Sequence, residues 1–155
     1  MKKATREWVR KAEKDYRLAE TIARGSEPFH DELCFHCQQS AEKYLKSLLE
    51  EAALLIPKTH DLDDLRGLLR ALHPTLHSLR RGLLFLSGFA VDTRYPGEWA
   101  TKRQATPFAG PAACARNVAS CSTSSRLDEA VCFVCGVAGS NAESRRVVAI
   151  NLRQR

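Results

Sequence analysis

Apolar residues recur every three or four positions along most of the first hundred residues, which is the period of amphipathic helices. The first stripe predicts a helix from Thr5 to Arg24, and we expect Gly25 to end it in the left-handed region of the backbone map. The stripe consists of Trp8, Ala12, Tyr16, Ala19 and Ala23. A second stripe predicts a helix over residues 29–54, which Pro57 stops. Its members are Leu33, Cys37, Ala41, Tyr44, Leu48 and Ala52.

Two leucine stripes and a short final segment complete this pattern. Asp61 is the expected N-cap of a third helix. The buried side of that helix would comprise Leu62, Leu65, Leu68, Leu69 and Leu72. A fourth helix is expected over residues 74–89, with Leu76, Leu79, Leu83 and Leu86 facing inward, and residues 98–105 open a fifth. Because no segment of this part alternates with period two, the sequence predicts an all-α, up-and-down bundle of four to five helices.

The composition of the chain changes near residue 105. Residues 105–155 contain six arginines, three carboxylates, four of the six cysteines and no lysine. Pro107 and Pro111 cannot continue a helix interior. We therefore divide the chain into a helical domain, residues 4–105, and an irregular C-terminal tail, residues 106–155. The tail is either a frameshifted or disordered segment or a genuine extension, and translation of the other two reading frames would distinguish these explanations.

The net charge of +6 permits contact with nucleic acid. In the helical part, however, basic residues alternate with acidic ones, and this mixture favours a solvated helical surface. No apolar run approaches the ~20 residues that a membrane-spanning helix needs. The N-terminal segment has two lysines but lacks the apolar core of a signal peptide. We therefore expect a cytoplasmic protein that does not associate with membranes.

Four ordered motifs carry a resemblance to a known family. They are Trp8-x3-Ala12-Glu13-x-Asp15-Tyr16, then Cys34-Phe35-His36-Cys37-Gln38-Gln39-Ser40-Ala41-Glu42-Lys43-Tyr44-Leu45-Lys46, then Pro57-Lys58-Thr59-His60-Asp61-Leu62, and Thr93-Arg94-Tyr95-Pro96. With these motifs, residues 4–105 resemble the HEPN domain (higher eukaryotes and prokaryotes nucleotide-binding domain). The resemblance implies a bundle of about five helices that pairs as a homodimer.

The resemblance also implies two functions, which stay open at this point. One is a nucleotide- or RNA-associated module that partners a minimal nucleotidyltransferase in a toxin–antitoxin-type pair. The alternative is a metal-independent endoribonuclease toxin. We expect neither a cofactor nor a metal ion.

Ribonuclease members of the family use an Arg and a His separated by four to six residues near the start of the last helix. Such a pair supplies an acid or base near the 2′-hydroxyl or leaving oxygen, and a cation for the developing phosphorane charge. Arg94 stands at the matching location, but residues 99–101 are Trp99, Ala100 and Thr101. The pair is therefore incomplete, and the catalytic residues stay unassigned, with Arg94 and His60 as the candidates.

The candidate nucleotide- or RNA-binding residues are Arg94, Tyr95, Lys58 and His60. Arg94 would bind a phosphate and Tyr95 would stack on a base; alternatively, Arg94 caps a helix and Tyr95 packs against its neighbours. Lys58 and His60 precede a helix N-terminus, which favours anions; alternatively, Thr59 and His60 cap that helix. In an up-and-down bundle both segments lie at one end and would face one cleft, where His60 would stand in for the missing histidine.

Two cysteine patterns are candidate sites. Cys34 and Cys37 fall one turn apart on a partly buried helix face, which favours packing over redox chemistry. The four tail cysteines lack the spacing of a usual zinc site. His36, Gln38 and Gln39 on the same helix favour an interhelical hydrogen-bond network over a site.

Overall fold

The computed structural model describes residues 1–91, 96–97 and 99–106. In chain order its elements are α1 (Lys3–Arg24), α2 (His30–Glu51), α3 (Leu62–Leu69), the 3₁₀ helix η1 (Pro74–Leu79), α4 (Arg80–Ser87), the 3₁₀ helix η2 (Gly88–Ala90) and α5 (Lys102–Ala105). No strand occurs in this described part, which confirms the all-α bundle. The tail cysteines lie outside the described residues, and the division of the chain at residue 105 stays a prediction.

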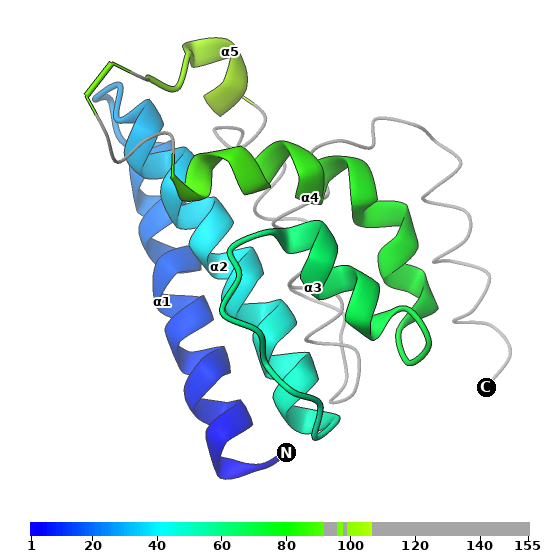
Figure 1. Ribbon diagram of the computed structural model, residues 1–155. Coiled ribbons are helices and arrows are strands. Elements are labelled where there is room, and N and C mark those ends of the chain that lie inside the picture. Colours follow the sequence, from blue (N-terminus) through cyan, green and yellow to red (C-terminus); the bar gives the residue numbers. More distant parts are fainter. Residues whose placement is uncertain (92–95, 98, 107–155) are drawn as a thin grey trace, which may run out of the picture.

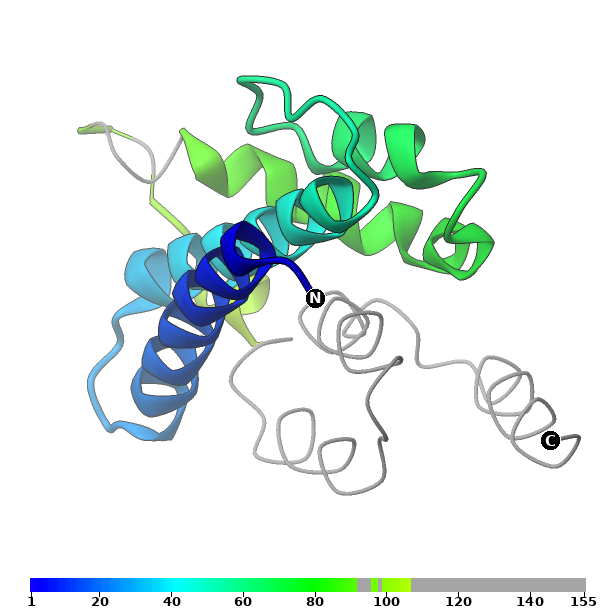
Figure 2. The same ribbon diagram turned by 90° about the horizontal axis from the view of Figure 1, so that it is seen from below.

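Helix α2 is the central element of the bundle (Figure 1). α1 packs antiparallel along one side of it, and α3 and α4 pack on the other side and cross it obliquely (Figures 1 and 2). Thirteen of the 22 residues of α2 are buried, which is why its apolar positions extend beyond one stripe. Leu45 and Leu49 are fully buried in the core that these helices share.

Small side chains let α1 and α2 approach each other closely. Ala12 and Ala41 are fully buried, and Ala19 is nearly so. The hydroxyl of Ser40 donates a hydrogen bond to the backbone carbonyl of Ala12 at 3.1 Å, which satisfies a buried polar group across the interface. The predicted stripe of α1 therefore faces α2, as the period of the sequence indicates.

The ends of the first two helices differ from the predictions. Gly25 has φ −72° and is extended rather than left-handed, because the chain leaves α1 directly toward Pro28. The left-handed residue is Ala53, with φ 56°. Ala53 ends α2 at Glu51, three residues before the predicted end, since the amide of Leu54 bonds to the carbonyl of Leu49 in the pattern of a Schellman motif.

The third helix begins as predicted and ends early. The Asp61 carboxylate accepts hydrogen bonds from the amides of Asp63 and Asp64, which confirms it as the N-cap. Leu62, Leu65 and Leu69 are fully buried. The prediction was wrong for the other two leucines: Leu68 is 50% exposed, and Leu72 is 55% exposed because the helix stops at Leu69.

The predicted fourth helix consists of three consecutive segments, η1, α4 and η2. Its four predicted leucines, Leu76, Leu79, Leu83 and Leu86, are all buried. The last described helix, α5, has four residues and begins with a capping box formed by Thr101 and Gln104. The amide of Ala100 donates a hydrogen bond to the Asp31 carboxylate, which fixes this segment at the beginning of α2.

Candidate functional site

The loop between α2 and α3 holds two predicted site residues, Lys58 and His60, both exposed. His60 Nδ1 lies 2.9 Å from Oε2 of Glu42 in the middle of α2, and the imidazole side chain is 54% exposed. Thr59 accepts a hydrogen bond from the amide of Asp61 and so supports the start of α3. His60 therefore contacts α2 rather than capping α3, which differs from the alternative considered from the sequence.

Glu42 lies at the centre of a buried polar cluster. The ammonium of Lys46 donates to Glu42 Oε1 at 2.7 Å, and the amide of Gln38 donates to Glu42 Oε2 at 3.1 Å. Gln38 also donates to the backbone carbonyl of His60 at 3.3 Å. On the α1 side, Lys46 Nζ lies 5.9 Å from the centre of the Trp8 ring. We call Gln38, Glu42, Lys46 and His60 the Glu42 cluster.

The Glu42 carboxylate is held in its ionised form. Burial acts to raise the pKa of Glu42, but the hydrogen bonds from Lys46, His60 and Gln38 outweigh burial and lower that pKa below its ordinary value of 4.5. A carboxylate on one ring nitrogen orients an imidazole and leaves the other nitrogen to exchange protons or contact an anion. The chemistry available to this cluster is therefore centred on the exposed edge of His60.

A second histidine, His36, pairs with a carboxylate between α1 and α2. His36 Nδ1 lies 3.1 Å from Oδ1 of Asp15, and Lys43 forms an ion pair with the same carboxylate. Gln39 donates to the side-chain oxygen of Gln38 at 2.8 Å. The contacts of His36 and Lys43 with Asp15 confirm an interhelical network for His36. Gln39, in contrast, bonds within α2, and Gln38 belongs to the Glu42 cluster.

The two cysteines of α2 are packing residues. Cys34 and Cys37 are both buried. Burial, assisted by the negative charge of Asp31, raises the pKa of the Cys34 thiol to about 12. A thiol with so high a pKa is not a reactive thiolate at neutral pH, which agrees with the structural interpretation of this pair.

Arg94 and Tyr95 lie outside the described residues, but the positions of the missing family histidine are described. Trp99 is 76% exposed, the amide of buried Ala100 bonds to Asp31, and Thr101 caps α5. None of these three residues carries an imidazole, and the backbone of Ala100 and the side chain of Thr101 hold the start of α5 in place. The segment begins a helix instead of presenting an imidazole.

The two candidate segments contact α2 at different levels. His60 meets α2 at Glu42, whereas Ala100 meets it at Asp31, eleven residues away and thus about 16 Å along the helix axis. The separation arises because the chain runs back along α2 between Ala52 and Asp61 before α3 begins (Figure 1). An up-and-down topology implied that the two segments lie at one end of the bundle, but they do not share one end of α2. A cleft formed by Arg94 with His60 stays a prediction.

Sequence reasoning did not assign a role to Glu42 or Lys46. Gln38, Glu42 and Lys46 follow one another at intervals of four residues, and this spacing indicates that the three side chains share one face of the helix. The sequence offered no signal that the loop bearing His60 would return to that face.

The comparisons with known proteins identify the family. The sequence model of the HEPN domain matches residues 5–113, which is most of the chain. The protein therefore belongs to the HEPN domain family, a family of helical modules associated with nucleotides and RNA. No curated protein and no solved structure matches the chain. Within the described residues, no helix is both long enough and apolar enough to span a membrane.

Proposed function

We propose that this protein is a nucleotide- or RNA-associated HEPN module that partners a minimal nucleotidyltransferase in a toxin–antitoxin-type pair, without cleaving RNA itself. The observation that carries the proposal is the local structure of residues 99–101. There Ala100 and Thr101 anchor and cap α5 at the place where ribonuclease members have their histidine. Without that imidazole, Arg94 lacks the histidine partner that ribonuclease members have at this spacing.

The proposed contacts with a nucleotide or RNA involve Lys58, His60, Arg94 and Tyr95. Lys58 and the exposed edge of His60 project from the loop before α3 and offer positive or hydrogen-bonding groups to a phosphate. Arg94 and Tyr95 would add a bidentate phosphate contact and a stacking ring. Binding a phosphate in this way requires no general base.

We also propose that the module is a homodimer. Helix α4 exposes Leu84 and Phe85, 46% and 42% exposed, beside its buried leucines. Exposed apolar side chains that form a contiguous patch mark protein–protein contacts, and we propose that these two belong to such a patch. A second copy of the chain would bury them.

The partnership is tested by co-expressing the protein with the minimal nucleotidyltransferase of the same genome, only one of the two carrying an affinity tag. We expect a complex of fixed stoichiometry that survives size-exclusion chromatography in moderate salt. A nucleotidyltransferase that elutes separately from the tagged protein would contradict the proposal. The Leu45→Ala variant, in which the core is loosened, is the control. A complex that increases in this variant would indicate association through unfolded protein.

One observation favours the alternative, a metal-independent endoribonuclease. The Glu42 carboxylate orients His60 as it would orient a general base, and the imidazole is half-exposed. Cleavage of single-stranded RNA in the presence of EDTA, lost in His60→Gln and in Arg94→Ala, would establish this alternative. Cleavage that persists in both variants would indicate a contaminating nuclease.

A further inference from the structure

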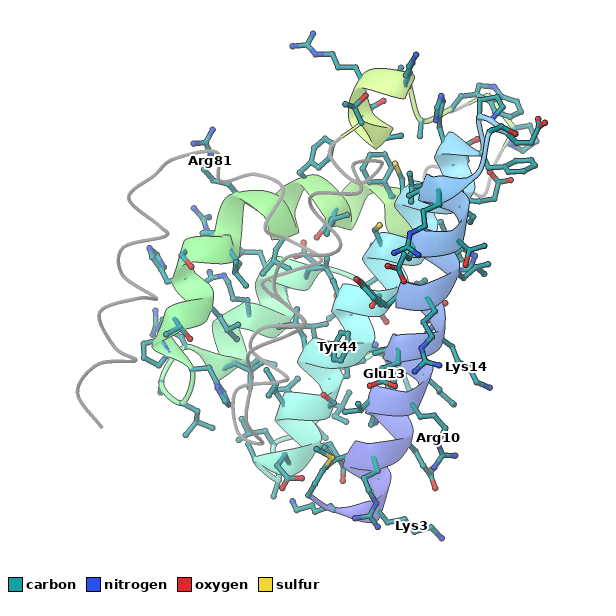
Figure 3. The ribbon with its side chains drawn as sticks, turned by 180° about the vertical axis from the view of Figure 1, so that it is seen from behind. Lys3, Arg10, Glu13, Lys14, Tyr44 and Arg81 are labelled. Atoms are coloured by element: carbon teal, nitrogen blue, oxygen red, sulfur yellow. The ribbon has the colours of Figure 1, made fainter. Side chains whose placement is uncertain are left out.

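The outer face of α1 carries a row of exposed cations. Lys3, Arg10 and Lys14 point away from α2 (Figure 3), and three further cations lie beside them. We call the set the α1 basic face; its members are Lys3, Arg6, Arg10, Lys11, Lys14 and Arg17, all exposed. Their intervals of three and four residues place the row along one side of the helix.

The helix separates charges that are mixed in the sequence. Asp15 turns toward α2 and pairs with Lys43, while Glu20 pairs with Arg24 beyond the row. Glu7 and Glu13 are the two exposed carboxylates between Lys3 and Arg17, against six exposed cations. The mixed sequence therefore folds into a strongly basic outer surface, which the count of acids and bases along the chain does not indicate.

Most of these cations have no anionic partner in the described part of the protein. Arg6 donates to the backbone carbonyl of Met1, and Arg17 lies 3.8 Å from Glu13, a loose contact. Within the described residues, Lys3, Arg10 and Lys14 form no ion pair. Their charges are thus available to an external anion.

The arrangement does not serve the stability of α1. Like charges three and four residues apart on a helix repel each other, as Arg6, Arg10, Lys14 and Arg17 do. The first turn contains no acidic residue, and Lys3 lies there against the positive end of the helix dipole. Repulsion between neighbouring cations and repulsion from the helix dipole both oppose helix formation. A pattern with this cost indicates a role in binding.

The shape of the row matches a single polyanionic strand. From Lys3 to Arg17 it extends about 21 Å along the helix axis, and its width is that of one helix. The two aromatic residues within this stretch, Trp8 and Tyr16, are both partly buried, Trp8 beside Lys46. The row therefore offers charge without a fully exposed ring on which a base would stack. Such a surface recognises the phosphate backbone and not the sequence of bases.

We infer that the α1 basic face docks the phosphate backbone of single-stranded RNA, separately from the loop that bears Lys58 and His60. The choice of RNA as the polyanion rests on the proposed function. The basic face then holds a strand by counterion release, while the loop and Arg94 contact a particular phosphate or nucleotide.

The test compares two triple variants with the same change in charge. The first is Lys3→Glu, Arg10→Glu and Lys14→Glu; the control is Arg70→Glu, Arg81→Glu and Lys102→Glu, three exposed cations outside α1. Binding of a fluorescein-labelled, mixed-sequence RNA of 20 nucleotides is followed by fluorescence anisotropy between 50 and 200 mM KCl. Circular dichroism verifies that both variants are folded.

We expect the α1 variant to reduce the slope of log K against log salt by about 2, because each phosphate contact of a single strand contributes about 0.7. The control should keep the slope of the unmodified protein. Equal losses in the two variants would overturn the inference, since net charge alone would then explain binding. So would tight binding of polyglutamate that is lost in the α1 variant, which would indicate an acidic protein partner, or tighter binding of DNA than of RNA of the same sequence.

Arg94→Ala separates this inference from the proposed function. Loss of RNA binding in the α1 variant but not in Arg94→Ala supports the basic face and removes Arg94 from the RNA contact. The reverse result overturns the basic face and leaves the proposed function standing. Absence of RNA binding by the unmodified protein at 50 mM KCl also overturns the basic face, while the complex with the nucleotidyltransferase is measured independently.

Discussion

At the scale of residues, the Glu42 carboxylate connects the candidate site to the stability of the fold. Its side chain is 6% exposed, that of its partner Lys46 is 9% exposed, and His60 lies on its other oxygen. Breaking a buried pair leaves one charge without compensation, which costs more than the pair itself contributes. The same carboxylate contacts His60, so one residue links the stability of the fold to the proposed binding loop.

We predict that Glu42→Gln lowers the free energy of unfolding at pH 7 by about 3 kcal/mol, since it leaves buried Lys46 without its partner. The folded-state pKa of Glu42 lies below its ordinary value of 4.5, so its contribution is fully present above pH 4.5 and is lost as the pH falls through the folded pKa. Urea unfolding should therefore show that the difference between variant and unmodified protein shrinks from pH 6 to pH 3. A difference that stays constant over this range, or one that Glu27→Gln reproduces at an exposed carboxylate, would contradict the role of Glu42.

The residue scale also shows which parts of the site were predictable. Asp61 as an N-cap depends on neighbours two and three residues away, and the sequence predicted it correctly. The partner of His60 lies eighteen residues earlier, on another element. No local pattern fixes such a pair, because it depends on the path that the loop takes over α2.

At the scale of elements, α2 determines the bundle because every other described helix packs either on it or on its neighbours. The apolar spacing predicted the helix and five of its thirteen buried residues, Leu33, Cys37, Ala41, Tyr44 and Leu48. The spacing did not predict that Ala53 would end α2 in the left-handed region, since alanine has no preference for it. It also placed Leu68 and Leu72 inside a helix that stops at Leu69.

We predict that Leu45→Ala lowers the free energy of unfolding by about 2–5 kcal/mol, the range for a buried leucine replaced without full collapse of the cavity. Leu55→Ala is the matched control, because Leu55 is 88% exposed in the loop after α2. It should change stability by less than about 0.5 kcal/mol. Similar losses from both variants in urea unfolding would show that α2 is not the centre of the core.

At the scale of the whole molecule, its surfaces differ in chemistry. The outer face of α1 is basic, the loop before α3 presents Lys58 and His60, and α4 exposes apolar side chains. Under the proposed function, these surfaces would bring together a polyanion, a second copy and a partner enzyme without a reaction centre in this chain. The family resemblance was readable from four motifs, whereas the separation of charge on α1 required the helix to be placed against α2.

We predict that the protein sediments as a dimer at micromolar concentration and that Leu84→Glu weakens the dimer by at least ~10-fold, because burying an unpaired carboxylate in an apolar contact costs more than about 1.4 kcal/mol. Leu55→Glu adds the same charge at an exposed loop position and should leave the dimer unchanged. A monomeric unmodified protein would exclude the dimer. Equal weakening by both variants would place the dimer contact away from Leu84.

The central claim is that the protein binds RNA and leaves it intact. It is tested most directly by incubating an excess of the purified protein with end-labelled single-stranded RNA in EDTA and dividing the sample between a native and a denaturing gel. The account predicts a retarded complex on the native gel and full-length RNA on the denaturing gel. Fragments that accumulate with time, and that disappear when Arg94→Ala or His60→Gln replaces the unmodified protein, would contradict it and establish a ribonuclease.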